Sequence, residues 1–270
     1  MAAKKTALAK ATTGTSMANI DAELNNEIAN LKNQIGQASG NKIRVEASGD
    51  FVLPDGANLG SEIQIVVLDF VSRNNFYTVA YNPNSPAPPD CYAIGPLASA
   101  GDPNGIAGMA PESDSPNIQN SDCATCPLNA FGSGAGGRSK ACQNRRLVAV
   151  LLVDPDNPEA HNAADATIYT LDLSPSNIKS FDGAISYATK SMGHYIKVIL
   201  TVTAKNVGTY AAVSFVEPTP NPDYAIHAQR RAEVGDMLTR KPDFTQRAAA
   251  AAPARRTTQA APRKAAGARR

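Results

Sequence analysis

Residues 63–71 read IQIVVLDFV, a run of aliphatic and β-branched residues that predicts a buried strand. The stretch Phe76–Tyr81 resumes this pattern after Arg73-Asn74-Asn75, so we expect the two stretches to form a hairpin around that turn. Asp69 interrupts the apolar run, and we interpret it as a hydrogen-bonded or edge residue rather than a catalytic base. This hairpin is the predicted centre of the fold.

Further short strands and two helices are expected around the hairpin. The predicted strands are Lys42–Ala47, Phe51–Leu53, Arg146–Val153, Thr167–Leu173, Ile196–Ala204 and Tyr210–Val216, the last two forming a second hairpin. The predicted helices are Pro175–Thr189, with Ser174 as its N-cap, and Asp223–Leu238. The expected fold class is mainly β with flanking helices, a small barrel or sandwich interrupted by a long loop.

The chain divides into four expected parts. Residues 1–18 are rich in Ala, Thr and Lys without periodicity and are expected to be a disordered arm. Residues 19–36 form an amphipathic helix whose stripe runs from Ile20 to Ile35, which either packs on its own domain or mediates self-association. Residues 37–240 make a β-rich core domain with the long loop at 82–144. Residues 241–270 are a disordered Ala/Pro/Arg tail.

Charge is unevenly distributed along the chain. The net charge is +2, but residues 245–270 carry seven basic residues and no acid, which leaves −5 on residues 1–244. A mildly acidic body with a cationic tail points to two partners rather than one uniformly basic surface. The longest apolar run, Leu147–Val153, is too short to span a bilayer, and no secretory signal opens the chain.

All four cysteines lie in or beside the loop at 82–144, which is longer than compact domains usually carry. Cys123 and Cys126 form a C-x2-C pair, with Cys91 upstream and Cys142 downstream. Four thiolates satisfy the tetrahedral preference of Zn²⁺, so this pattern predicts a structural zinc site that orders the loop. Two disulfides or four unrelated buried thiols are the alternatives.

The second half of the loop has the composition of a single-strand binding groove. Four bases and no acid occur between Cys123 and Val153, next to a glycine-rich stretch at 132–137. Cations meet phosphates, and aromatic rings stack on bases. The candidate nucleic-acid contacts are Phe76, Tyr77, Tyr81, Tyr92, Phe131, Arg138, Lys140, Arg145 and Arg146. A solvated knuckle with core aromatics is the alternative.

Several motifs resemble a family of bacteriophage-encoded proteins, some of them labelled single-stranded DNA-binding proteins. The resemblance covers roughly residues 42–216 and rests on IVVLDF at 65–70, PPDCYAIG at 88–95, C-x-x-C-P-x-N-x-F-G-S at 123–133 and K-A-C-x-N-x-R-L at 140–147. Family members often have Trp where this chain has Phe131. The resemblance implies an OB-like barrel interrupted by a zinc-bearing loop, and a role in phage replication or recombination.

These observations favour a non-enzymatic protein that binds single-stranded DNA in the cytoplasm of the bacterial host. His161, His194 and His227 are isolated, and no nucleophile or carboxylate pair is evident. A zinc-stabilised virion or replication-machine component is the alternative, and a duplex binder acting through the tail is a third possibility. Replication proteins are further possible partners.

Overall fold

The computed structural model describes residues 41–79, 87–100, 108–154, 156–157, 159–208, 210–216 and 218–244. The expected arm, the helix at 19–36, Tyr81 and nearly all of the basic tail lie outside these residues. The strands are β1 (Lys42–Val45), β2 (Phe51–Val52), β3 (Glu62–Phe76), β4 (Cys91–Leu97), β5 (Gln143–Val153), β6 (Ile168–Leu173), β7 (Val198–Asn206), β8 (Ala211–Phe215) and β9 (Thr219–Pro220). The helices are η1 (Ala98–Ala100), η2 (Pro127–Asn129), η3 (Ala135–Gly137), α2 (Glu159–Asn162), α3 (Pro175–Met192), η4 (Tyr195–Lys197), α4 (Tyr224–Arg230), η5 (Arg231–Glu233) and α5 (Gly235–Thr239).

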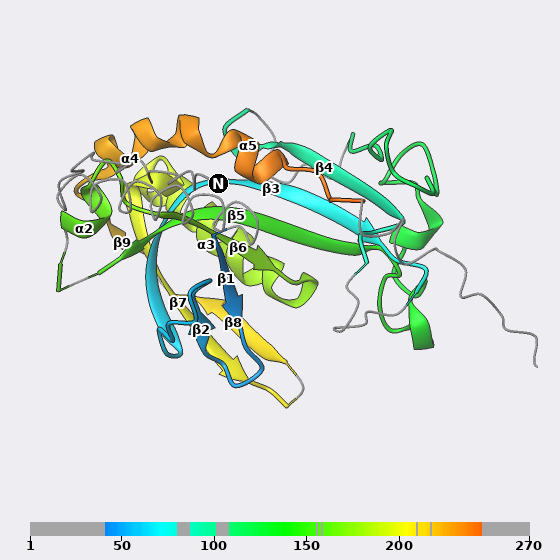
Figure 1. Cartoon of the computed structure of the whole chain (residues 1–270), viewed down its shortest axis with the longest axis horizontal. Helices are drawn as coiled ribbons and strands as arrows, with labels where there is room; N and C mark the ends of the chain where they lie inside the picture. Colours follow the sequence, from blue (N-terminus) through cyan, green and yellow to red (C-terminus); the bar gives the residue numbers. More distant parts are fainter. Residues whose placement is uncertain are drawn as a thin grey trace, which may run out of the picture.

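Strand β3 is the central element, a single strand of 15 residues that runs the length of the molecule beside β5 (Figure 1). The predicted turn at Arg73-Asn74-Asn75 is therefore wrong. Those three residues pair with Arg145, Asn144 and Gln143 of β5 on one side. They pair with residues of β4 on the other side. Ladder hydrogen bonds on both sides outweigh the local turn preference of the asparagines.

The strands form one curled, mixed sheet that resembles half of a barrel. Its order is β2-β1-β6-β5-β3-β7-β8, with β4 paired to β3 and β9 paired to β7. Strands β1 and β6 are parallel, and the other pairs are antiparallel. The predicted hairpin at 196–216 is confirmed as β7 and β8.

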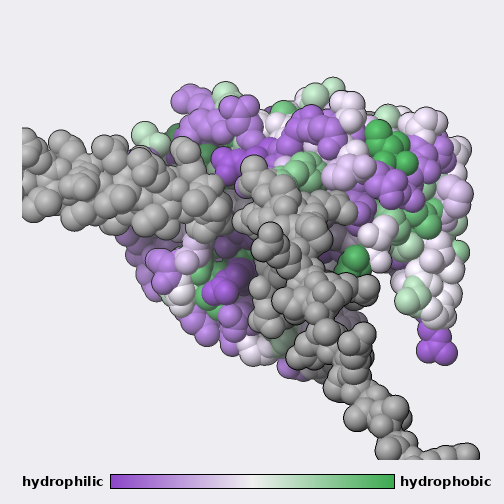
Figure 2. All heavy atoms as spheres, turned by 45° about the vertical axis from the view of Figure 1, so that its right-hand side comes forward, coloured by the Kyte–Doolittle hydropathy of each residue, from purple (hydrophilic) through white to green (hydrophobic). Residues whose placement is uncertain are grey.

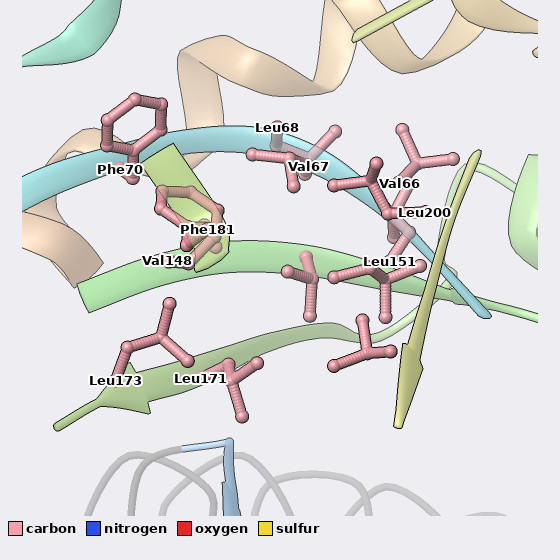
Figure 3. Packing of buried hydrophobic residues seen from close by; sticks show 14 of the residues in the cluster. Val66, Val67, Leu68, Phe70, Val148, Leu151, Leu171, Leu173, Phe181 and Leu200 are labelled. Carbon is pink, nitrogen blue, oxygen red and sulfur yellow. The ribbon is translucent and has the colours of Figure 1, made fainter. Parts of the chain in front are cut away.

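Helix α3 covers one face of the sheet and confirms the helix predicted at 175–189. The Phe181 ring meets Phe70 of β3 edge-on, with 5.0 Å between centroids, and meets Phe215 of β8 at 5.3 Å. Aliphatic side chains of β3, β5, β6 and β7 fill the remaining space (Figure 3). Burial of the whole stretch Ile65–Val71 explains why the sequence there is apolar rather than alternating.

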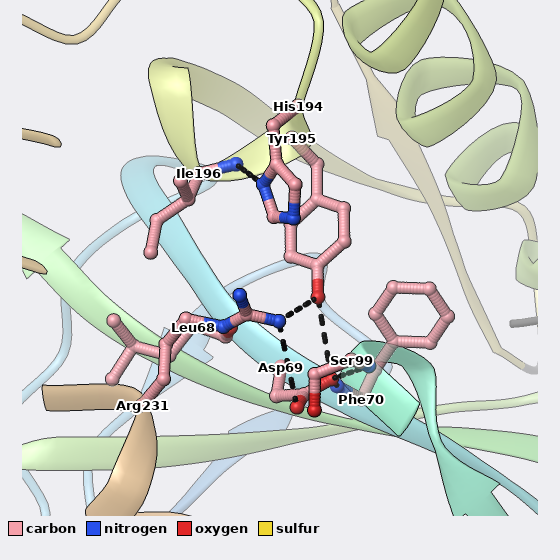
Figure 4. Close-up of polar contacts among 8 residues, drawn as sticks. All are labelled: Leu68, Asp69, Phe70, Ser99, His194, Tyr195, Ile196 and Arg231. Atoms are coloured by element: carbon pink, nitrogen blue, oxygen red, sulfur yellow. Dashed lines mark hydrogen bonds and ion pairs between the residues drawn. The ribbon is translucent and has the colours of Figure 1, made fainter. Parts of the chain in front are cut away.

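The C-terminal helices α4 and α5 pack across β3 (Figure 1). The helix predicted at 223–238 is broken into α4, η5 and α5, and the last segment begins at Gly235, a residue type that disfavours helix interiors. Arg231 donates to the carbonyl of Leu68 and approaches the buried Asp69 carboxylate at 3.8 Å (Figure 4). Asp69 is thus a buried, hydrogen-bonded residue, one of the two structural roles expected for it.

Two of the three histidines are buried. His161 of α2 and His227 of α4 face each other with ring centroids 5.4 Å apart. His194 instead caps η4, where its Nδ1 accepts a hydrogen bond from the backbone N–H of Ile196. Each histidine therefore has a structural place in the fold.

Candidate metal centre and nucleic-acid interface

The four cysteines come together around one cavity of about 20 Å³. Cys91 begins β4, where it pairs with Phe76 of β3, and Cys142 directly precedes β5. The backbone N–H of Cys123 donates to the Met109 carbonyl at 2.9 Å, which ties the C-x2-C turn to the preceding loop. Strands and loop bonds thus gather thiols that lie up to 51 positions apart in the sequence.

The described part of the long loop contains regular secondary structure of its own. It contains β4, η2 and η3, and the N–H of Cys142 donates to the Leu128 carbonyl at 2.8 Å. Ala93, Met109 and Cys123 form a small buried cluster in this region, and Cys91 and Tyr92 are also buried. Among its described residues the loop therefore has a small apolar core, which adjoins the cysteine cavity through Ala93 and Cys123.

All four cysteines are free thiols. Within the described part of the chain, no three His, Cys, Asp or Glu side chains stand close enough to form a ready metal site. Burial raises the pKa of Cys91 and Cys123 and raises that of Cys142 to about 12. The neighbouring thiols of the cluster raise these pKa values further, because a thiolate beside another thiolate is disfavoured.

A buried amide with an unpartnered nitrogen lines the same cavity. Asn74 of β3 is 2% exposed, and its Nδ2 makes no hydrogen bond. Its Oδ1 accepts from Asn144 Nδ2 at 2.6 Å, which fixes the orientation of the amide. The Asn74 amide also lowers the pKa of the Cys123 thiol, against the larger effect of burial, and both side chains line the cavity.

A chain of polar groups links Asn74 to a cation. Lys140 Nζ donates to Asn144 Oδ1 at 2.9 Å and to Asn129 Oδ1 at 3.2 Å. Asn129 in turn donates to the Cys123 carbonyl at 2.8 Å. The positive charge of Lys140 lowers the pKa of Cys142 against the larger effect of burial. Lys140, one of the predicted nucleic-acid contacts, is exposed, and its ammonium is held by Asn129 and Asn144.

The residue types around this cavity are those of a structural zinc site, although no three of these described side chains form a ready metal site as they are placed. Four thiolates would supply the sulfur set that zinc prefers, with the Asn74 amide lining the same cavity. A divalent cation would favour the deprotonated form of the thiols and so reverse their raised pKa values. The sequence analysis did not identify Asn74, Asn129 and Asn144 as site residues. The one sequence feature that could have indicated them is their spacing around the cysteines.

The structure separates the predicted nucleic-acid contacts into accessible and inaccessible residues. Phe131 is 77% exposed, and Arg138 is exposed in the same glycine-rich turn. Tyr92 is buried and hydrogen-bonded to Asp114, while Phe76 lines the cysteine cavity. The Tyr92 ring is therefore not an accessible stacking surface in this conformation, whereas Phe76 is partly exposed.

The other predicted nucleic-acid contacts also differ in the accessibility of their side chains. Arg146 is 2% exposed, and both of its nitrogen contacts go to Asp182. Arg145 is half-buried and donates to Asp172 at 2.7 Å. Tyr77 is half-buried, and burial raises its pKa while the nearby Arg145 lowers it. Arg146 is thus withdrawn into the fold, whereas Arg145 and Tyr77 are partly exposed.

The chain matches no protein-family model, no curated protein and no solved structure. The functional argument therefore rests on the residues themselves. Among the helices that the structure describes, none is both long and apolar enough to cross a membrane.

Proposed function

We propose that this protein binds single-stranded nucleic acid without strong sequence preference and that a structural zinc ion holds its cysteine segment. The observation that carries the proposal is the turn at 131–138, which presents an exposed Phe131 ring and the Arg138 cation from a segment built around four thiols. A ring that stacks on bases and a cation that meets phosphate are the two elements of sequence-tolerant strand binding.

The surroundings of this turn support the same proposal. Gly132, Gly136 and Gly137 adopt positive φ angles, a backbone that other residues rarely adopt and that allows close approach of a ligand. Hydrophilic residues interspersed with isolated hydrophobic ones cover the described part of the face drawn in Figure 2. A polar surface with single exposed rings suits a polyanion better than an apolar protein partner.

The resemblance to phage proteins completes the proposal. We interpret the curled sheet as an OB-like half-barrel, and we place the protein in phage DNA replication or recombination, in the host cytoplasm. No catalytic constellation is part of this proposal, because the buried titratable groups are engaged in structural contacts such as Asp69 with Arg231.

The test is fluorescence anisotropy with labelled single-stranded and duplex oligonucleotides. The full-length chain is used with the seven basic residues of 245–270 replaced by Gln, so that tail electrostatics do not contribute. Tighter binding to single strands supports the proposal, with Phe131→Tyr retaining affinity and Phe131→Leu losing about 1–3 kcal/mol. Absence of binding overturns it and favours a structural component of a larger phage assembly.

A further inference from the structure

A groove of about 470 Å³ lies between β1 and β8, away from the cysteine cavity. Strand β8 ends the sheet order, β1 is the second strand from the other end, and the two are not paired with each other. Residues of β1, β6 and β8 line the groove, together with the start of α3 and Arg145 of β5. The incomplete closure of the half-barrel therefore leaves an open channel.

The charges that line this groove are mainly positive. Lys42, Arg44 and Arg145 are basic, and Asp172 is the acid among the lining residues. Asp172 bridges two of the cations, with Lys42 Nζ at 2.9 Å and Arg145 Nε at 2.7 Å. This network holds the two cations at fixed positions while the lining keeps an excess of positive charge, as a phosphate backbone requires.

An exposed aromatic ring lines the same groove as these cations. Tyr210 lies on the β8 side and is 51% exposed. A ring in a groove that also holds cations provides a stacking surface for bases along the track of the backbone.

Strand β5 connects the groove to the cysteine segment along the chain. Arg145, which lines the groove, is the third residue after Cys142. A strand that contacts Phe131 and Arg138 would therefore find further cations where β5 enters the sheet. The two surfaces can belong to one interface that follows β5.

We propose that the groove between β1 and β8 binds the sugar–phosphate backbone of a nucleic-acid single strand, with Arg44 and Tyr210 as its accessible contacts. This inference rests on the proposed function and locates the interface on the half-barrel rather than on the cysteine segment alone. Arg44 is the most informative position, because it is exposed and its removal breaks no ion pair that the structure records.

The experiment measures binding of labelled oligothymidylate to the full-length chain with the neutralised tail, over a range of salt concentrations. Arg44→Gln should weaken binding and reduce the salt slope by about 0.7, as expected for one lost phosphate contact. Tyr210→Ala should weaken binding roughly fivefold or more, while Tyr210→Phe retains it. Asp172→Asn, which removes the negative charge, should strengthen binding.

Lys179→Gln on the exposed surface of α3 is the matched control and should leave affinity and salt slope unchanged. Circular dichroism and thermal unfolding establish that each variant is folded. If the starting protein binds single strands but the Arg44, Tyr210 and Asp172 variants bind equally well, the groove proposal is overturned and the proposed function stands. If the starting protein binds no single strand, both are overturned.

Discussion

The side chain of Asn177 accepts a hydrogen bond from the backbone N–H of Val213 at 3.2 Å. One turn further along α3, Ser180 Oγ accepts from the N–H of Phe215 at 3.0 Å. Strand β8 is the last strand of the sheet path, so these donors would otherwise be unpaired. The helix thus satisfies the outer edge of β8 with side chains, which protects it from pairing with another chain.

Loss of this edge contact should destabilise the fold. Asn177→Ala leaves the N–H of the buried Val213 without an acceptor, and we expect a loss of about 1–3 kcal/mol in the free energy of unfolding. Urea denaturation followed by circular dichroism measures this change. Lys179→Ala, on the same helix but exposed, should stay within about 0.5 kcal/mol of the wild type. Equal stability of both variants would contradict the edge-sealing role.

The buried pair His161 and His227 predicts acid sensitivity. Burial lowers the pKa of both imidazoles from 6.5, so the folded protein holds them neutral. Between the lowered and the ordinary pKa the unfolded chain binds more protons than the native one. Stability from this pair is therefore complete above about pH 6.5 and is lost as the pH falls below it.

Urea unfolding at several pH values between about 5 and 8 tests this dependence against the ordinary histidine pKa. His161→Leu removes one of the two buried titrating groups and should flatten the decline on the acid side. A variant whose unfolding free energy changes with pH as steeply as that of the wild type would rule out this origin. His194 has a pKa that burial also lowers and is retained in both proteins, so the comparison cancels its contribution.

Metal removal should loosen the cysteine segment and leave the sheet core intact. We expect the purified protein to contain about one zinc ion per chain, measured by elemental analysis, and Cys123→Ser to contain less. Chelation should raise hydrogen exchange in residues 108–142, while the stretch Val148–Leu151 in the core stays protected. Unchanged exchange in a metal-free sample would show that the segment needs no metal.

Asn74 should affect metal retention through its contact with the thiols. Asn74→Leu removes the unpartnered amide nitrogen from the cavity lining and should weaken zinc binding by about 10–100-fold in competition with a chromophoric chelator. Arg138→Gln changes an exposed residue of the same segment and should leave zinc affinity unchanged. If both variants retain zinc equally, the amide serves only the packing of β3.

Arg146 should matter for stability and not for nucleic acid. Its side chain is 3% exposed and pairs with the partly exposed Asp182 at 3.2 Å. Asp182→Ala leaves a buried guanidinium without its partner and should cost about 3–5 kcal/mol. Arg146→Met should cost less, because the remaining carboxylate reaches water. Chemical denaturation measures the loss of unfolding free energy in each variant. A larger loss for Arg146→Met than for Asp182→Ala would show that the guanidinium is not effectively buried.

The sequence was most informative where local pattern and tertiary context agree. The strand at 63–71, the helix from Pro175 and the hairpin of β7 and β8 were predicted because burial and periodicity act over a few neighbouring residues. The extended conformation of Arg73-Asn74-Asn75 was not predicted, because it depends on pairing with β5, which lies some 70 positions away in the sequence. Mainly β architecture followed from these local patterns, whereas strand order did not.

The candidate site, too, could be predicted where it depends on sequence spacing and could not where it depends on tertiary contacts. Cysteine spacing drew attention to the four thiols, and they do line one cavity. Charge counting could not distinguish Arg138, which is exposed, from Arg146, which is held by Asp182 of a later helix. The groove between β1 and β8 could not be predicted from the sequence, because its lining residues come together only in the curled sheet.

The uninterrupted course of β3 has a consequence for assembly of the cysteine segment. One end of the strand is anchored among Val66 and Phe70, and the other end aligns β4 and β5 beside the thiols. Pairing with β3 therefore positions Cys91 and the approach to Cys142 as the sheet forms, whereas Cys123 and Cys126 depend on loop contacts. If a metal ion binds there as proposed, the sheet would position two of its ligands and loop contacts alone would position the C-x2-C pair, so that loosening of the loop would release that pair while β3 stays folded.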